Sequence, residues 1–219
     1  MEQTQQAVES VNEGDSLFRT RFFVMLWVAS LFSSLSMSMF MFVQSWYVVQ
    51  GLGLEVALGL VLISLSVPRI IFMMVGGVLS DRKDQSRIMF LSDLSSAFLA
   101  LVLVLLFVFA QPVPLWVLVV NAILFGTLGG IFEPARDSIL PVVVHPELLT
   151  RANSIIQGTM QVALFSGPLL AGIVLGISGY GILFLLIGVC LLEPFVFNLY
   201  ERINQRRQNQ TTYRGFGIS

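Results

Sequence analysis

Six long stretches of this chain are too apolar to lie on the surface of a soluble protein. A helix needs roughly 20 apolar residues to cross the hydrocarbon core of a bilayer. None of the stretches alternates between apolar and polar residues as a transmembrane β-strand does. The sequence therefore predicts an all-α integral membrane protein with six transmembrane helices in residues 22–200, a cytoplasmic segment 1–21 and a polar tail 201–219. The stretches are 22–49, 54–80, 88–110, 115–132, 153–177 and 180–199.

Composition supports the same conclusion. Hydrophobic residues make up 56% of the 219 residues, and charged residues only 11%. Soluble domains carry about 25% charged residues, so this chain has too few to cover a folded surface exposed to water. Most of its length is expected to face lipid or other helices.

The basic residues predict the orientation in the membrane. Positively charged residues concentrate in cytoplasmic loops. The connections near 51–53, 111–114 and 178–179 contain no Lys or Arg. We therefore expect both termini and the two longer connections on the cytoplasmic side. The membrane itself is expected to be the plasma membrane or the inner membrane of the cell. Trp46 and Tyr47 are expected in the outer aromatic belt. The basic residues outside the predicted helices are Arg19, Arg21, Arg82, Lys83, Arg87, Arg136, Arg151, Arg202, Arg206, Arg207 and Arg214.

A weak repeat at a spacing of 100 residues links the second and fifth helices. Residues 66–68 read Ser-Val-Pro and residues 166–168 read Ser-Gly-Pro, while Gly76 recurs as Gly176. Many transporters contain paired three-helix units of opposite orientation, which would make these two helices equivalent. Such a biased composition also produces echoes by chance. We expect a three-plus-three inverted repeat without regarding these matches as proof.

The connection after the second helix resembles the loop signature of the major facilitator superfamily. Residues 76–87 read GGVLSDRKDQSR, with glycines, Asp-Arg and further basic residues in the family order. The glycines would let two helices approach closely, and the charges would latch helix ends on the cytoplasmic side. The resemblance implies a gating latch that includes Gly77, Asp81, Arg82 and Arg87. Uncharged residues stand at 85 and 86, where family members usually carry arginines.

Two further segments resemble one branch of that superfamily, which contains bacterial drug and siderophore exporters. Residues 132–141, FEPARDSILP, are similar to its connection between the fourth and fifth helices, where Pro141 and Pro146 are expected to break the chain before a new helix begins. Gly167, Pro168 and Gly172 are similar to the Gly-Pro signature of antiporters. The three motifs occur in the family order.

The resemblance implies the N-terminal six-helix half of a transporter whose two halves surround a central cavity. Such a half would work with a second copy of itself or with a separate C-terminal half. The branch implies proton-coupled efflux of small hydrophobic or amphiphilic compounds. The alternative is a truncated, transport-inactive membrane bundle or a partner-binding subunit.

Arg69 is the most unusual residue, because it lies near the middle of the second helix. A charged side chain there costs roughly 2.5–3.5 kcal/mol on insertion scales, so it should face the bundle interior or a wet cavity. Two readings stay open. Arg69 could contact substrate or a proton pathway, or it could pair with a carboxylate such as Asp93 or Glu133.

Charged residues near the inner end of the fourth helix are expected to join it to the second. Glu133 and Asp137 are four residues apart and share one helix face, with Arg136 beside them. We predict that Glu133 and Arg136 extend the cytoplasmic latch. The alternative is a set of side chains that reach out to the membrane interface.

Two intramembrane carboxylates are candidates for proton coupling. Glu193 lies in the sixth helix and Asp93 about one and a half turns into the third. Such residues commonly mark ion pathways. Each could instead extend to the membrane interface, and for Asp93 this alternative is the stronger one.

Polar stripes on the fifth and first helices complete the candidate site. Asn153, Gln157 and Gln161 recur every four residues, and Gln157 and Gln161 join Arg69 as cavity candidates. The stripe lines a water-filled cavity or forms hydrogen bonds between helices. Ser30, Ser34 and Ser38 form a similar stripe, for which helix packing is the default.

The sequence contains no sign of an enzyme or of a cofactor. His145 is the one histidine and Cys190 the one cysteine, so we expect no metal site. There is no phosphate-binding loop or nucleophile motif, and no basic patch of the kind that binds nucleic acid. The expected partners are the lipid bilayer, a small-molecule substrate if the chain is active, and a second bundle.

Overall fold

The computed structural model describes residues 17–18, 20–82 and 85–192, and within these ranges the chain forms helices and no strands. Among these described residues, five helices are long and apolar enough to cross a membrane. The long helices are α2 (Arg21–Trp46), α3 (Leu58–Arg82), α4 (Gln85–Phe109), α5 (Leu115–Val143) and α6 (Leu149–Cys190). Short helical turns η1 (Tyr47–Gly51), η2 (Glu55–Ala57) and η3 (Pro146–Leu148) lie between them.

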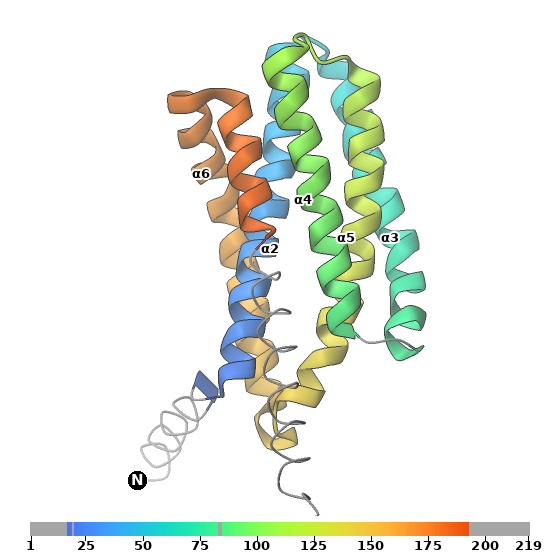
Figure 1. The fold of residues 1–219 in the computed structure, drawn as a ribbon, viewed down its shortest axis with the longest axis vertical. Helices are drawn as coiled ribbons and strands as arrows, with labels where there is room; N and C mark the ends of the chain where they lie inside the picture. Colours follow the sequence, from blue (N-terminus) through green and yellow to red (C-terminus); the bar gives the residue numbers. More distant parts are fainter. Residues whose placement is uncertain (1–16, 19, 83–84, 193–219) are drawn as a thin grey trace, which may run out of the picture.

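The chain runs back and forth along one axis (Figure 1). One end of the bundle holds the start of α2 and the connections from α3 to α4 and from α5 to α6. The other end holds residues 52–54 and 110–114. The first three predicted transmembrane helices therefore lie within a few residues of their predicted bounds.

Helix α6 changes direction at Gly179, which has φ 78° and ψ −179°. This combination is essentially restricted to glycine, because a Cβ would clash with the backbone. Figure 1 shows the chain turning back at this point. The sequence places the connection between the fifth and sixth helices here. Residues 193–199 of the predicted sixth helix lie outside the described residues, so six complete crossings and the inverted repeat remain predictions.

Helix α5 is longer than the sequence predicts. The prediction ends it at residue 132 and breaks the chain at Pro141, whereas α5 continues through both Pro134 and Pro141 to Val143. That prediction is wrong because α5 buries Ala135 and Ile139 against the bundle, and such packing outweighs the roughly 3 kcal/mol that an interior proline costs. Pro146 begins the turn before α6, as the sequence predicts.

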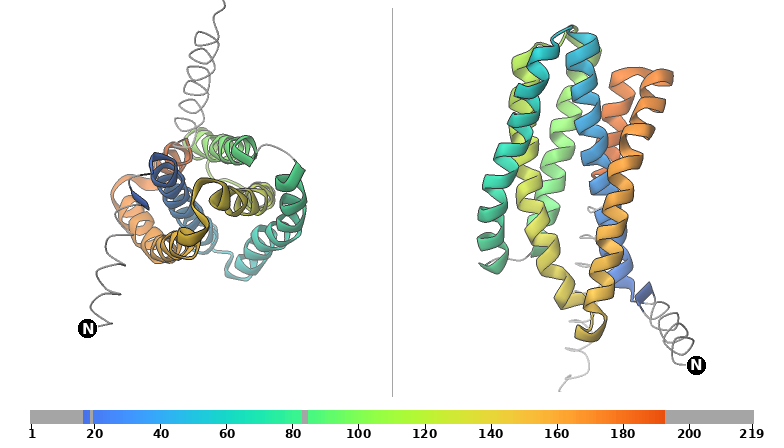
Figure 2. Two further views of the ribbon diagram at one scale, coloured as in Figure 1. Left: turned by 90° about the horizontal axis from the view of Figure 1, so that it is seen from below. Right: turned by 180° about the vertical axis from the view of Figure 1, so that it is seen from behind.

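The helices pack mainly in two pairs, α3 with α5 and α2 with α6, while α4 packs against α5 and α6. Figure 2 shows the same arrangement from the end of the bundle. The predicted repeat makes the first and fourth helices equivalent, and likewise the second and fifth. This exchange converts the pair α3–α5 into the pair α6–α2, so the observed pairing is compatible with the predicted repeat. Trp27 Nε1 donates a hydrogen bond to Thr159 Oγ1 at 2.8 Å and joins α2 to α6.

Glycines allow α3 and α5 to approach closely. A Cβ at Gly126 would lie 2.1 Å from the carbonyl oxygen of Leu65, and one at Gly130 would lie 2.4 Å from that of Arg69. A Cβ at Gly76 would lie 2.9 Å from the carbonyl oxygen of Gly130. Small residues in this pattern are typical of membrane helix pairs, which depend on van der Waals contact. Since no side chain fits there, these glycines set the separation of the two helices.

Aromatic residues fill the centre and one end of the bundle. Phe40 of α2 stacks on Phe125 of α5 with ring centroids 3.7 Å apart. Tyr47 is buried and its Oη accepts a hydrogen bond from the backbone N–H of Val113 at 2.9 Å. Tyr47 is therefore not part of an aromatic belt, because its polar end is bonded inside the protein, whereas Trp46 is exposed.

The outward faces of α3 and α6 are the least covered parts of the bundle. The most apolar windows of these two helices are 17% and 22% buried, against 39% for the other three. Their exposed side chains include Ile63 and Met74 on α3 and Phe165 and Ile177 on α6. These apolar faces suit contact with lipid or with another membrane helix bundle.

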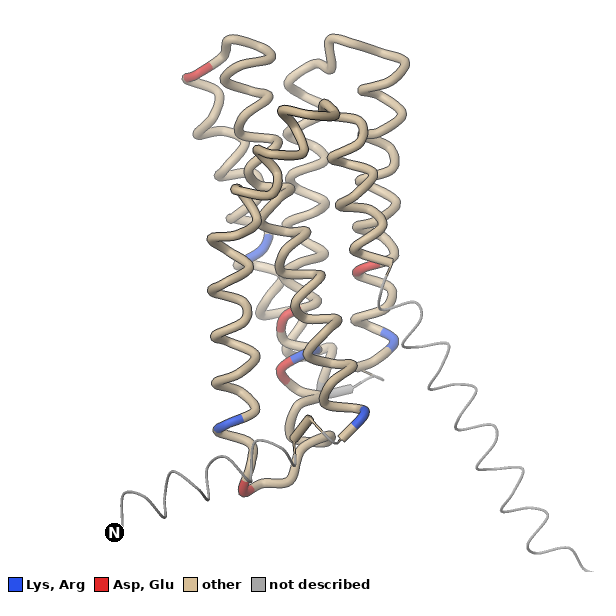
Figure 3. Tube along the Cα trace, turned by 90° about the vertical axis from the view of Figure 1, so that its left-hand side faces the viewer, with Lys and Arg blue, Asp and Glu red and all other residues tan. Residues whose placement is uncertain are grey.

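Charged residues gather toward one end of the bundle. Figure 3 shows most blue and red positions in the lower half, whereas the top of the bundle is almost free of them. The cluster includes Arg87, Arg136 and Arg151, and the isolated carboxylate is Glu55. This asymmetry agrees with the uneven distribution of basic residues between the predicted connections. The orientation of the bundle in the membrane stays a prediction.

Adjacent glycines on α5 provide a matched test of the close contact. We expect Gly130→Ala to destabilise the chain by about 1–3 kcal/mol, because its Cβ would overlap a backbone carbonyl that cannot move aside. We expect Gly129→Ala to leave stability unchanged or slightly higher, because its Cβ would meet only the flexible Met37 side chain at 3.7 Å. The measurement is the thermal unfolding midpoint of each purified variant in detergent. Equal midpoints would contradict the proposed contact.

Candidate functional site

A cavity of about 230 Å³ lies between α2, α3, α4, α5 and α6, at the level of the intramembrane charged residues. Its wall combines apolar side chains with charged and amide side chains. The polar and charged residues that line it are Ser33, Ser34, Ser38, Arg69, Asp93, Ser96, Glu133, Arg136, Gln157 and Gln161. The structure thus places the predicted cavity residues Arg69, Gln157 and Gln161 around one space. Their role in transport stays a prediction.

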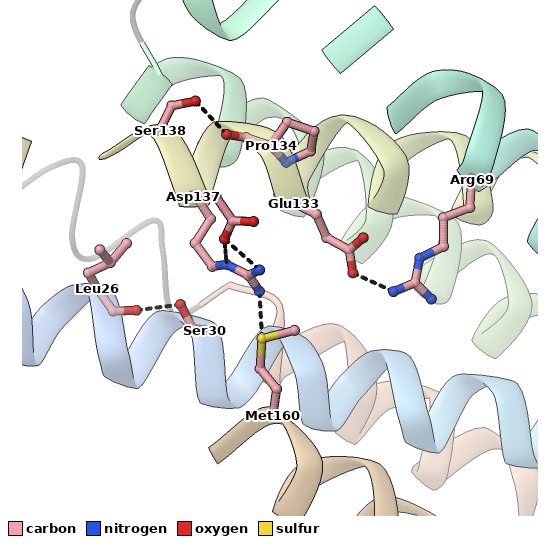
Figure 4. A network of polar contacts seen from close by, with 9 residues as sticks. Leu26, Ser30, Arg69, Glu133, Pro134, Asp137, Ser138 and Met160 are labelled. Carbon is pink, nitrogen blue, oxygen red and sulfur yellow. Dashed lines mark hydrogen bonds and ion pairs between the residues drawn. The ribbon is translucent and has the colours of Figure 1, made fainter. Parts of the chain in front are cut away.

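Arg69 forms an ion pair with Glu133, from Nη2 to Oε1, across the α3–α5 contact (Figure 4). Of the two partners that the sequence leaves open for Arg69, the structure selects Glu133. The side chain of Arg69 is 37% exposed and that of Glu133 is 17% exposed, so the pair borders the cavity and is not sealed in the core. Glu133 therefore contributes to the cavity wall. It also joins α3 to α5, the second and fourth predicted transmembrane helices, as the sequence predicts.

Arg136 is a second arginine in the cavity wall, and its side chain is 3% exposed. Its Nε and Nη2 donate to Asp137 Oδ1 at 2.9 and 2.8 Å, and its Nη1 points at Met160 Sδ at 2.9 Å. Figure 4 shows Met160 reaching this group from α6. A buried guanidinium needs such a charged partner, because leaving it unpaired in a medium of low dielectric constant is costly. Arg136 does not extend to the membrane interface.

Asp93 of α4 is buried, with 3% of its surface exposed. Its Oδ1 accepts a hydrogen bond from Ser33 Oγ of α2 at 3.2 Å, while Oδ2 has no partner among the described residues. The alternative that Asp93 extends to the membrane interface therefore fails. The reason is the packing of α4 on α5 and α6, which covers a position that the sequence places near the helix end.

The amide stripe on α6 is exposed, in contrast to Asp93 and Arg136, which are buried. Asn153, Gln157 and Gln161 are all exposed, and Gln157 and Gln161 line the cavity. Within the described residues no hydrogen bond joins these three amides to a neighbouring helix. The structure thus favours the cavity-lining interpretation of the stripe over helix-to-helix bonding.

The Gly-Pro motif has a packing role in this structure. A Cβ at Gly167 would lie 2.6 Å from the Cβ and Oγ of Ser38, so Gly167 permits the close contact of α6 with α2. Ser38 Oγ also donates to the carbonyl oxygen of Leu164 at 2.9 Å. Gly172 has only an ordinary contact with Phe42 at 3.9 Å, and Pro168 lies inside α6 without ending it.

The predicted latch is only partly visible. Asp81 and Arg82 end helix α3, and their side chains lie outside the described part of the structure. Arg87 follows on α4, and a Cβ at Gly77 would meet nothing within 4 Å, so Gly77 is not one of the close-contact glycines. Glu193, the other coupling candidate, lies outside the described residues. The gating role of these residues stays a prediction.

Several residues of the site escaped the sequence analysis. Ser33 lies beside the predicted serine stripe, and no sequence signal links it to Asp93, because the predicted bounds place the two residues at different depths. Met160 and the glycines Gly126 and Gly130 have no charge pattern that would mark them. Among the described residues, no group of three His, Cys, Asp or Glu side chains could hold a metal ion.

Residues 26–212 match the family profile described as Major Facilitator Superfamily. The chain belongs to the major facilitator superfamily. This membership makes it part of a family of membrane transporters, and the match covers all five long helices nearly completely.

Two curated relatives are members of the same family. The chain is 28% identical over 146 residues to the Staphyloferrin A transporter of Staphylococcus aureus, an alignment that covers 67% of this chain and 37% of the relative. It is 29% identical over 84 residues to the uncharacterized MFS-type transporter YvqJ of Bacillus subtilis, covering 38% of this chain and 20% of that protein. The matched regions thus cover 37% of the length of the first relative and 20% of the length of the second.

A double-mutant cycle tests the ion pair between α3 and α5. We expect Arg69→Gln and Glu133→Gln each to lower stability, because each leaves one charge without its partner. The double variant should be more stable than the sum of the two losses predicts, with a coupling of about 0.5–3 kcal/mol. Because the side chain of Arg69 is 37% exposed, we expect a coupling energy near the lower end of this range. Additive shifts in the thermal unfolding midpoint would show that the pair does not form.

Proposed function

We propose that this superfamily member exports small hydrophobic or amphiphilic compounds and that the cavity between its helices forms one wall of the substrate path. The observation that carries the proposal is the set of polar and charged side chains that surround one intramembrane space. A structural bundle would gain nothing from such a lining, since unsatisfied polar groups in the hydrocarbon region are costly.

Exposed amides on α6 indicate that the open side of the cavity does not face lipid. Gln157 and Gln161 are exposed at a level where the membrane is apolar. Polar residues within membrane helices almost always face the bundle interior or a water-filled cavity. A second helix bundle that covers this side would enclose a water-filled space and leave the other faces of α3 and α6 to lipid.

The second bundle could be another copy of this chain or a separate six-helix protein. Secondary transporters alternate access by rocking two bundles around a fixed central site. In that assembly we propose that Asp81, Arg82 and Arg87 act as the cytoplasmic gate, with both termini in the cytoplasm. The relative in Staphylococcus aureus is a transporter of staphyloferrin A by its name, which supports a transport function here.

Replacing the two cavity amides tests the substrate path. We expect cells that produce the Gln157→Leu/Gln161→Leu variant to export the amphiphilic dye rhodamine 6G at least tenfold more slowly than cells with the unchanged chain. The amides are exposed and bonded to no other described helix, so the change should spare the fold. Val162→Leu is the matched control, because Val162 is adjacent and 65% exposed but does not line the cavity.

The comparison with an empty vector separates the two main outcomes. Energy-dependent export by cells that produce only this chain would show that a second copy is sufficient. Dye retention equal to that of the vector, at normal membrane levels of the chain, would count against export of this dye by the chain alone. It would favour a required separate bundle or the inactive membrane bundle.

Substituting Asp81, the acidic residue of the loop signature, tests the gate. We expect Asp81→Asn to abolish dye export while membrane levels stay normal, because the latch that the family resemblance implies needs the negative charge. Asp84→Asn, which removes a carboxylate from the same connection but outside the signature pair, should retain export. Equal rates in the two variants would contradict the gating role of Asp81.

A further inference from the structure

A second cavity, of about 700 Å³, lies between α4, α5 and the part of α6 that follows Gly179. The described residues that line it carry no charge, and its polar side chains are the hydroxyls of Ser95 and Thr127. Thr127 Oγ1 already donates to the carbonyl oxygen of Ile123 at 2.9 Å. This cavity therefore offers a ligand almost only apolar contact, unlike the charged cavity of the candidate site.

The second cavity is elongated along the bundle, and we call it the apolar groove. On α4 it extends from Leu94 to Val104, and on α6 from Phe184 to Leu192. At a rise of 1.5 Å per residue, the stretch on α4 is about 15 Å long. Figure 1 shows this last part of α6 beside α4, with which it packs. A long and narrow apolar space suits an extended hydrocarbon chain better than a compact molecule.

The apolar groove is a hollow between helices and not simply an exposed helix face. Gly188 lines it, and a Cβ at that position would lie 3.7 Å from the Cβ of Ala100, which is an ordinary contact. Phe184 also lines it and is fully buried. Phe98 and Val189 line the same space and are exposed, so the groove is open to its surroundings.

Hydrocarbon surrounds this part of the bundle, because α4, α5 and α6 are membrane-crossing helices. A hollow that stayed empty would deprive the side chains of its wall of van der Waals contacts. Its volume lies in the range of about 300–1,000 Å³ that is typical of small-molecule sites. Lipid chains are the apolar molecules that such a hollow meets in a bilayer.

We propose that the apolar groove is a binding site for one acyl chain of a membrane phospholipid. Val104 is five residues before the end of α4 at Phe109, whereas Leu94 is nine residues after its beginning at Gln85. An acyl chain therefore reaches the groove over a shorter distance from the end of the bundle that holds residues 110–114. We assign the lipid to the leaflet at that end. The inference does not depend on the proposed export function.

The bound chain would also complete the wall of the polar cavity. Leu128 of α5 lines both the polar cavity and the apolar groove. The neighbouring residues Leu191 and Leu192 of α6 divide in the same way, with Leu191 in the polar cavity and Leu192 in the groove. An acyl chain in the groove would pack against Leu128 from behind and restrict its movement, because close-packed side chains have few alternative positions.

Photolabelling with a lipid probe tests this site. The full chain is reconstituted in phosphatidylcholine nanodiscs that contain a small share of phosphatidylcholine with a diazirine in one acyl chain, and peptide mass spectrometry locates the label after irradiation. We expect Phe98 and Val189 to carry roughly fivefold more label than Leu105 and Val120, since a site encloses its ligand more fully than a helix face does. Leu105 and Val120 are similarly exposed and line neither cavity.

Two positions of the diazirine test the direction of the chain. A diazirine near the ester should label Leu101, which is closer to the end of α4 at Phe109. A diazirine at the end of the acyl chain should label Leu94 and Leu192. The reverse order would overturn the assignment to that leaflet.

Variants that fill the groove provide the decisive comparison. Gly188→Leu places a side chain in the groove, and Val189→Trp narrows it from an exposed position. Each should lower the label on Phe98 to the level of Leu105 while the thermal unfolding midpoint stays unchanged. Gly176→Leu is the matched control, because a Cβ there would meet nothing within 4 Å and Gly176 lines neither cavity.

Each other result would overturn the site. Equal label on Phe98 and Leu105 in the unchanged chain would show ordinary contact with the bilayer. Enrichment that persists in both folded groove-filling variants would show that the lipid binds elsewhere. Less label on Phe98 than on Leu105 would show that something other than lipid occupies the groove.

Discussion

The cost of placing a charge in the hydrocarbon region governs the arrangement of this bundle. Arg69 lies in the middle of α3, where it requires a partner or water. Glu133 supplies the partner from α5, and the two helices can bring these side chains together because Gly126 and Gly130 carry no Cβ where the backbones approach most closely. The ion pair therefore depends on the close approach that the glycines allow. A larger residue at Gly130 would push away the backbone that carries Arg69 itself.

The second helix pair follows a similar principle with different groups. Gly167 of α6 leaves room for Ser38 of α2, and the hydroxyl of Ser38 donates a hydrogen bond to a backbone carbonyl oxygen of α6. Helix α4 packs against both pairs and brings Asp93 to Ser33. These contacts bury two charged side chains almost completely and leave the amides of α6 exposed. An intramembrane cavity with an uncovered polar side results, which connects the packing to the transport family to which the chain belongs.

Sequence reasoning succeeded where membrane physics acts on a single segment. It placed the first three helices, the connection at Gly179 and the turn at Pro146 that precedes α6. It also predicted the charged link between the second and fourth helices, which are α3 and α5 in the structure. It failed at Pro141, because a local rule that prolines end helices ignores the packing that keeps α5 intact. It also misplaced Tyr47, whose hydroxyl binds the backbone of Val113, a residue that no local pattern connects to it.

The sequence by itself determined the class of protein, since apolar length and the scarcity of charge leave a membrane helix bundle as the available solution. It also determined which residues are expensive in a membrane, because that cost depends on residue type and depth. Only the tertiary structure decided how this cost is met. It shows that Glu133 neutralises Arg69, that Arg136 binds the neighbouring Asp137, and that Oδ2 of Asp93 has no partner among the described residues. Pairing depends on distances between helices, and these distances arise from packing at glycines far apart in the chain.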